Sequence, residues 1–282
     1  MKKNVTVLVA GLLAGLADAV QANLIAYEGF RTTAAAEDYT AGNFLNQKPV
    51  VGNFGFNDTM GWVGNTGALN VTDLPFSHSA LVGPAESGSA RIYSQAGGRG
   101  VSRSLAASPV GSTVYYMSGL VNLVSEARVP ENEYRTAGFM GTTVSTSPVS
   151  HADGMHYGLR NVGGTVYLAA WAGGSAYNIA PLPSTGVTYQ VVLKLDVNAG
   201  GTDTLSAWYS AHGDTELTKG FIGQAVETWS KVDDLRRLTL QTGGTGTSTT
   251  LFTSFDEIYL GTALSDVTVL SGSSMISLII IQ

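Results

Sequence analysis

The sequence contains no cysteine, so disulfide bonds, thiolate catalysis and cysteine-ligated zinc are all excluded. Charged residues are also scarce, at 13% of the 282 residues compared with about a quarter in an average soluble protein. After Lys2-Lys3 the chain has no basic cluster beyond Arg236-Arg237, and its net charge is −6. A nucleic-acid binder needs a basic patch, so we expect no nucleic-acid partner.

Glycine and apolar residues are plentiful, with 35 glycines and 44% hydrophobic residues. Apolar and polar residues alternate over short runs such as Tyr189 to Val197, and Gly, Asn and Asp separate these runs. No long amphipathic helix pattern follows residue 22. The pattern predicts an all-β protein, an antiparallel β-sandwich of jelly-roll type, with a single domain over residues 23–270.

The first 22 residues have the form of a secretory signal peptide. Lys2 and Lys3 precede a nearly uncharged apolar run from Val5 to Ala17, and small residues follow. Cleavage is expected after Ala22, with Ala19 as the alternative site. We therefore expect a secreted or cell-surface protein.

The last twelve residues, 271–282, combine a Gly/Ser hinge with an apolar, β-branched strand. This strand is too short for a membrane span, which needs about 20 residues, so no transmembrane anchor is expected in the mature chain. A strand of this kind can pair with a sheet edge of its own chain, which is the preferred hypothesis. Pairing with another copy would instead cause self-association and make the protein a structural subunit of a filament or matrix.

The run from Thr249 to Ser265, TTLFTSFDEIYLGTALS, is the most informative part of the sequence. In an extended chain, Phe255, Glu257 and Tyr259 share one face, while Asp256 and Ile258 share the other. Both faces carry large apolar residues, which predicts a strand inside a sheet. The carboxylates of Asp256 and Glu257 then need partners, and we expect hydrogen bonds from a neighbouring loop.

The segment FDEIYLGTALS resembles the closing strand of laminin-G-like, concanavalin-A-like jelly rolls. Residues 189–210 resemble the antiparallel pair that precedes that strand, and NLIAYEGF, GWVGNTGALNV and GVSRSL resemble pieces of exported bacterial members of this group. Many members carry a Pro-Glu-Pro C-terminal sorting signal, which this tail lacks. The resemblance implies a concanavalin-A-like fold and a non-catalytic surface or extracellular-matrix protein or glycan binder. Its expected partner is a polysaccharide or a cell-surface glycan.

A glycoside hydrolase or lyase on the same scaffold is a further alternative. Glu126, Glu131 and Glu133 form the densest group of acids, and glycosidases use two carboxylates. The E-x-D-x-x-E strand spacing of retaining glucanases with this fold is absent, however. We therefore expect a solvated loop, no catalytic residue and no enzymatic activity.

Three tryptophans are candidate ligand-binding residues, because an indole ring offers an apolar face and a polar edge. They are Trp62, Trp171 and Trp208. For Trp62 the preferred hypothesis is an anchor in the core.

Two groups of residues are candidate metal sites. Asp196, Asn198 and Asp203 are hard oxygen ligands in one loop, so calcium is the one cofactor considered; an Asx-rich hairpin turn without metal has the same residues. His151, Asp153 and His156 form the one histidine cluster, for which a turn flanked by exposed histidines is preferred over a metal site.

Turn signals predict several local connections. Gly97-Gly98 predicts a hairpin between the runs 90–93 and 101–105, and residues 161–164 predict a turn between strands 155–159 and 165–171. Residues 225–232 predict one or two helical turns.

Overall fold

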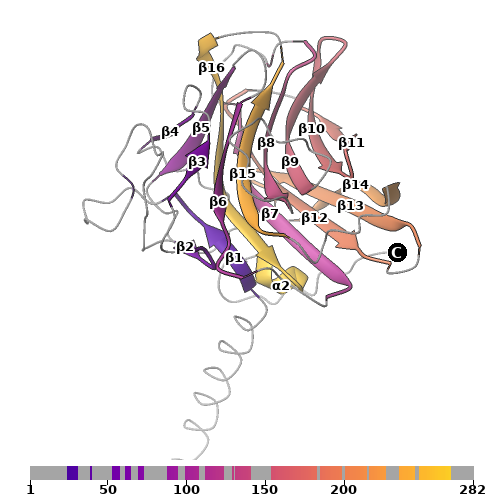
Figure 1. Cartoon of the computed structure of the whole chain (residues 1–282). Coiled ribbons are helices and arrows are strands. Elements are labelled where there is room, and N and C mark those ends of the chain that lie inside the picture. The colour runs from indigo at the N-terminus through magenta and orange to yellow at the C-terminus, as the bar shows by residue number, and fades with distance from the viewer. Residues whose placement is uncertain are drawn as a thin grey trace, which may run out of the picture.

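The computed structural model describes residues 24–30, 39, 53–57, 61–64, 69–72, 88–94, 99–107, 112–123, 129, 131–140, 154–182, 185–198, 201–214, 216–226, 235–244 and 248–267. Within these ranges the chain forms two antiparallel β-sheets that pack on each other (Figure 1). This arrangement confirms the predicted antiparallel β-sandwich of jelly-roll type. None of the helices in these ranges has the length and hydropathy of a membrane span.

The nine-stranded sheet of this described part has the order β14-β13-β12-β7-β16-β1-β2, with β5 paired to β16 and β4 paired to β5. Its strands are β1 (Leu24–Glu28), β2 (Asn53–Phe54), β4 (Leu69–Thr72), β5 (Ser89–Ser94), β7 (Val114–Asn122), β12 (Thr188–Asp196), β13 (Asp203–Ala211), β14 (Thr218–Val226) and β16 (Ser248–Gly261). The short helix α2 (Leu264–Val267) follows β16 and contacts β16 and β7.

The seven-stranded sheet has the order β11-β10-β9-β8-β15-β6-β3. Its strands are β3 (Val63–Gly64), β6 (Arg99–Ser104), β8 (Tyr134–Met140), β9 (Gly154–Val162), β10 (Thr165–Ala172), β11 (Ser175–Pro181) and β15 (Arg237–Gly243).

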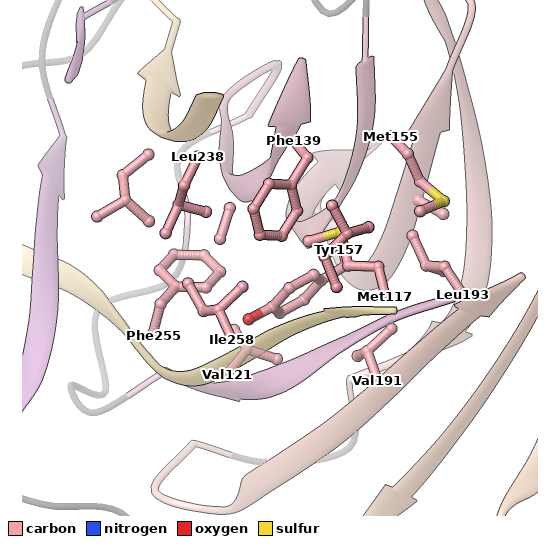
Figure 2. Packing of buried hydrophobic residues seen from close by; sticks show 14 of the residues in the cluster. Met117, Val121, Phe139, Met155, Tyr157, Val191, Leu193, Leu238, Phe255 and Ile258 are labelled. Carbon is pink, nitrogen blue, oxygen red and sulfur yellow. The ribbon is translucent and has the colours of Figure 1, made fainter. Parts of the chain in front are cut away.

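The hydrophobic core lies between the two sheets. Tyr157 of β9 meets Phe255 of β16 edge-on, with ring centroids 5.8 Å apart, and its hydroxyl donates to the carbonyl of Leu120 on β7 (Figure 2). Met155 and Leu159, two residues away on either side, are also fully buried in this core. Because side chains alternate along a strand, the residues between them face away from the core. This alternation places His156, Gly158 and Arg160 on the opposite, outer face of the seven-stranded sheet.

Several connections agree with the turn signals. β9 and β10 form a hairpin through Gly163 and Gly164, whose φ angles are +58° and +83°. Positive φ is the backbone region that glycine occupies without steric cost, so these two residues determine where the chain turns. β12 and β13 pair in continuous register, as predicted for residues 189–210.

One local prediction was wrong. The runs 90–93 and 101–105 do not form a hairpin, because β5 pairs with β16 and β4 while β6 pairs with β15 and β3 in the other sheet. The segment that links them therefore joins the two layers. Of the helical turns predicted for residues 225–232, residues 225–226 belong to strand β14, and the rest lie outside the described residues.

Candidate functional site

The strands of the seven-stranded sheet contain five arginines and one histidine but no Asp, Glu or Lys. The arginines are Arg99, Arg103, Arg135, Arg160 and Arg237. Arg103 and Arg135 point into the sandwich, where Arg103 pairs with Glu28 at 2.9 Å and Arg135 lies 3.9 Å from Glu133. Arg160 and Arg237 belong to the outer face. In a chain with a net charge of −6, this face is a local concentration of positive charge.

The outer face is arranged in rows that cross the strands. One row contains Trp171, His156, Gly138, Thr239 and Ser102, on β10, β9, β8, β15 and β6. The next contains Ala169, Gly158, Thr136, Gln241 and Gly100. The third contains Tyr167, Arg160, Tyr134 and Gly243. Apart from Gln241, the middle row has small side chains, and the aromatic and cationic side chains lie in the rows on either side.

Arg160 lies between Tyr167 of β10 and Tyr134 of β8. Burial lowers the pKa of Arg160, and the nearby Tyr167 opposes that shift. Its Nε atom is buried and has no hydrogen-bond partner among the described residues. Since no described carboxylate pairs with this guanidinium, a bound anion would supply the missing charge and acceptor.

Tyr134 completes the third row. Burial raises the pKa of its hydroxyl, so the group stays protonated at neutral pH and can donate a proton or a hydrogen bond. Its ring lies 6.3 Å from the ring of Trp171, centroid to centroid. In the pairing register Tyr134 and Trp171 are four positions apart, which is a backbone distance of about 13 Å along the strands. Strand β9 lies between their two strands. A Cβ atom on Gly243 of β15 would lie 2.2 Å from Cζ of Tyr134, so the tyrosine ring lies over that glycine.

Arg237 stands at the other end of the face. Its Nη1 donates to the hydroxyl of Ser102 on β6 at 3.3 Å, and burial lowers its pKa. The hydroxyl of Thr239, two residues along β15, is buried without a hydrogen-bond partner among the described residues. A second cation and an unused hydroxyl thus lie on the same strand, on the same side of the sheet.

His156 is fully buried in the middle of β9. This corrects the expectation that His156 is exposed beside a turn. His151 and Asp153 lie outside the described residues. In the ranges that the structure describes, no three His, Asp or Glu side chains gather closely enough to hold a metal ion.

The three candidate tryptophans occupy three different environments. Trp62 is fully buried in the core, where its Nε1 donates to the hydroxyl of Tyr39 at 2.6 Å. Trp171 belongs to the outer face of the seven-stranded sheet and is 4% exposed. Trp208 lies on the outer face of the other sheet and packs partly buried against a small cluster that includes Val192 and Tyr259. Of the three, Trp171 alone lies on the outer face of the seven-stranded sheet, whereas Trp208 is the register partner of Lys219 on β14.

The proposed calcium ligands lie at the β12–β13 hairpin of the nine-stranded sheet. One carboxylate oxygen of Asp203 accepts a hydrogen bond from the backbone N–H of Asn198 at 2.8 Å. Asp196 pairs with Lys194 at 2.7 Å. These contacts are those of an Asx-stabilised turn, and calcium at this loop stays a prediction.

The clustered acids are dispersed in the structure. Glu131 is exposed, Glu133 is buried beside Arg135, and Glu126 lies outside the described residues. Glu257 accepts hydrogen bonds from the hydroxyls of Tyr259 at 2.7 Å and of Tyr27 at 3.1 Å, which belong to strands β16 and β1, while the predicted bonds from a neighbouring loop stay a prediction. No pair of carboxylates faces a common surface among these residues.

Sequence reasoning missed Arg160, Tyr134 and Arg237 as site residues. They are isolated in the sequence and form no motif, and only strand pairing places them on one face of the sheet. A usable signal was present in β9, where the alternation of Met155, Tyr157 and Leu159 assigns His156 and Arg160 to the opposite face.

No protein-family model and no curated protein matches the sequence. Solved structures do resemble the fold. A PL-14 alginate lyase from Aplysia kurodai gives a TM-score of 0.47 at 11% identity, over 81% of this chain and 100% of that chain. The alginate lyase Aly36B gives a TM-score of 0.44 at 13% identity, over 85% of this chain and 98% of that chain. A GH43 glycoside hydrolase gives a TM-score of 0.43 at 11% identity, over 82% of this chain and 42% of that chain.

At these identities the likeness concerns the fold alone. The expectation of a non-catalytic surface, matrix or glycan-binding protein, with no enzymatic activity, is nevertheless corrected here. The solved structures that resemble the chain are polysaccharide lyases and glycoside hydrolases. The hydrolase or lyase alternative is taken up below as a proposal.

Proposed function

We propose that the chain cleaves an acidic polysaccharide by β-elimination on the outer face of the seven-stranded sheet. One observation carries this proposal: the strands of that sheet contain arginine and histidine but no Asp or Glu. A uronate polymer carries a carboxylate on each sugar, and uncompensated guanidinium groups are suited to bind it.

The same observation separates a lyase from a glycoside hydrolase. A typical glycoside hydrolase places two carboxyl groups on either side of the scissile bond. The strands of this sheet supply none. β-Elimination instead needs a positive charge beside the sugar carboxylate, a base for the proton on the adjacent carbon, and a proton donor for the leaving oxygen.

Two outer-face residues match the first and third of these roles. Arg160 binds the sugar carboxylate and stabilises the negative charge that develops on it. The base that takes the proton from the carbon next to the carboxylate must lie beside Arg160, which excludes the fully buried His156, four residues away along β9. The electron pair of that C–H bond forms a carbon–carbon double bond, the C–O bond to the leaving sugar breaks, and Tyr134 gives its proton to the leaving oxygen. Trp171 provides an apolar ring beside this group.

Substitution of Arg160 by Gln tests the proposal. The variant should bind and cleave sodium alginate or a glucuronan with KM raised about 10- to 100-fold, which corresponds to the ~1.5–3 kcal/mol of a hydrogen bond to a charged group. Neutral xylan should not be cleaved by either protein. Lys219→Gln is the matched control, because it removes one positive charge from an exposed position on β14 of the other sheet. Equal loss of activity in both variants, or none in either, would remove Arg160 from the site.

We also propose that the enzyme acts after export, since the leader at residues 1–22 would deliver it to extracellular polysaccharide.

A further inference from the structure

The outer face of the seven-stranded sheet is closed in its middle and open at one border. The first two of its rows are buried, and their larger polar side chains are at most 2% exposed: Thr136, His156, Thr239 and Gln241. In the third row the side chains of Tyr167, Arg160 and Tyr134 are half-buried. Val162, two residues beyond Arg160 on the same face of β9, is 43% exposed. A polysaccharide therefore has access to this face along the third row, where a bound chain crosses the strands.

Arg160 is the one arginine or lysine among the described outer-face side chains that is not buried. Arg237, the other guanidinium of this face, is 5% exposed. It lies six residues along β15 from Gly243, the third-row position of that strand, which is a backbone distance of about 20 Å. The buried rows lie between them. Neighbouring sugars of one polysaccharide chain cannot bind both guanidinium groups.

The residues beside Arg160 in the third row carry no formal charge. Tyr167 on β10 and Tyr134 on β8 are its register partners, and the exposed Pro181 on β11 is the partner of Tyr167. Paired strands lie about 4.8 Å apart, so these are its nearest neighbours across the sheet. A sugar carboxylate over a phenol ring or Pro181 would lose water without gaining a cation. A neutral sugar suits these positions, because a tyrosine offers an apolar ring and a hydroxyl.

We propose that the site binds one carboxylate at a time, so that its substrates include polysaccharides in which each uronate stands between neutral sugars. This inference rests on the proposed function and adds Tyr167 as a residue that binds the sugar next to the uronate. Elimination needs only the carboxylate of the reacting sugar, since the negative charge develops on that group. Carboxylates on the flanking sugars are neither bound nor required.

Partial reduction of the carboxylates of one polymer tests how many of them the site binds. The substrate is sodium alginate or glucuronan, whichever the wild-type chain cleaves, intact and with a random half of its carboxylates reduced to primary alcohols. For a site that binds one carboxylate, kcat/KM per sugar residue should fall to about half on the reduced polymer. A fall to about a quarter or less would show that adjacent carboxylates are bound together, and it would overturn the inference while leaving the lyase proposal in place.

Two variants test the residues named here. Arg160→Gln should raise KM by the same factor on both polymers, and a smaller factor on the intact polymer would reveal a second cation and overturn the inference. Tyr167→Ala should raise KM about 2- to 10-fold on both polymers with kcat little changed, whereas Tyr167→Phe, which keeps the ring, should leave KM within about twofold of the wild-type value. An unchanged KM in a folded Tyr167→Ala protein would remove Tyr167 from the site.

Failure of the proposed function is distinguishable from failure of this inference. If the wild-type chain cleaves neither intact polymer, the lyase proposal is overturned. The binding of intact and half-reduced alginate to the immobilised chain then decides the number of carboxylates. An equal dissociation constant per uronate would support binding of one carboxylate, and weaker binding per uronate of the reduced polymer would overturn it.

Discussion

The carboxylate of Glu28 is the most heavily coordinated buried charge in the described part of the chain. It accepts hydrogen bonds from Arg103 and from the hydroxyl of Tyr39 at 2.9 Å, and from the backbone N–H of Phe30 at 3.2 Å. Trp62 in turn donates to Tyr39. One carboxylate therefore connects the N-terminal strand β1, β6 and two segments between them.

Replacing Arg103 by Met should destabilise the protein severely. The substitution leaves the Glu28 carboxylate fully buried without its cation, which typically costs about 3–5 kcal/mol. Urea unfolding of the two proteins measures the difference. Arg91→Met, at a half-buried position on strand β5 of the other sheet, is the comparison. A loss below about 1 kcal/mol for Arg103→Met would show that the ion pair contributes little.

The pH dependence of stability should report the burial of Glu28. Burial raises the pKa of this carboxyl above 4.5, and Arg103 and Tyr39 offset only part of that shift. The folded state therefore holds the proton more tightly than the unfolded state. The contribution of Glu28 to stability is complete below pH 4.5 and decreases as the pH rises through the raised pKa. As the pH rises through this range, the free energy of unfolding of the wild type should fall relative to that of Glu28→Gln. A rise of the wild type relative to the variant would contradict the burial argument.

At the scale of elements, the long strand β16 shows where the alternation of side chains along a strand fails to predict which face they occupy. The sequence predicted Phe255, Glu257 and Tyr259 on one face. In the structure Phe255, Ile258 and Leu260 are in the core, whereas Tyr259 belongs to a separate cluster on the outer face. A register shift against β7 between Asp256 and Tyr259, with Glu257 at φ +49°, exchanges the two faces. A bulge of this kind inserts one residue, and a periodic pattern does not reveal it.

The tyrosines that hold Glu257 at this bulge should contribute measurably to stability. Tyr27 and Tyr259 stack with ring centroids 4.6 Å apart, and both hydroxyls donate to the Glu257 carboxylate. Tyr259→Phe should cost about 1.5–3 kcal/mol, because it removes a buried hydrogen bond to a charged group. Tyr209→Phe is the control, since the structure gives that hydroxyl no hydrogen bond within the described ranges. Equal melting temperatures for the two variants would argue against a stabilising role of the bulge contacts.

The elements that the sequence predicted best are those whose signals are local. The β9–β10 hairpin depends on two adjacent glycines, and the β12–β13 pair on unbroken alternation. The β5–β6 prediction failed because a glycine-rich link between two strands has the same composition whether it closes a hairpin or crosses between sheets. The candidate site was not predicted for a related reason: Arg160, Tyr134 and Arg237 share one face only through pairing between strands distant in the sequence.

For the whole molecule, the unequal distribution of charge between the two sheets is the feature that bears on function. The seven-stranded sheet carries arginines without carboxylates, whereas the strands of the other sheet carry both signs, including Asp196, Asp203 and Glu257. Binding of an acidic polymer should therefore weaken steeply as the salt concentration rises, and the polymer should bind to the seven-stranded sheet in preference to the other sheet.

Export is a separate prediction at this scale. The mature protein should begin at Asn23, as the charged start, the apolar run and the Val-Gln-Ala ending of the leader predict. Intact-mass measurement of the secreted protein decides this. A mass that retains residues 1–22 would contradict it.

The chemistry of the cleaved products tests the central claim most directly. Purified wild-type chain is incubated with sodium alginate and with a glucuronan, and the released oligosaccharides are analysed by mass spectrometry. β-Elimination predicts products that end in an unsaturated sugar, each lighter by one water than the product of hydrolysis, and Arg160→Gln should form them more slowly at low substrate. Saturated products, or no cleavage of any acidic polysaccharide, would contradict the proposal that this sheet is a lyase site.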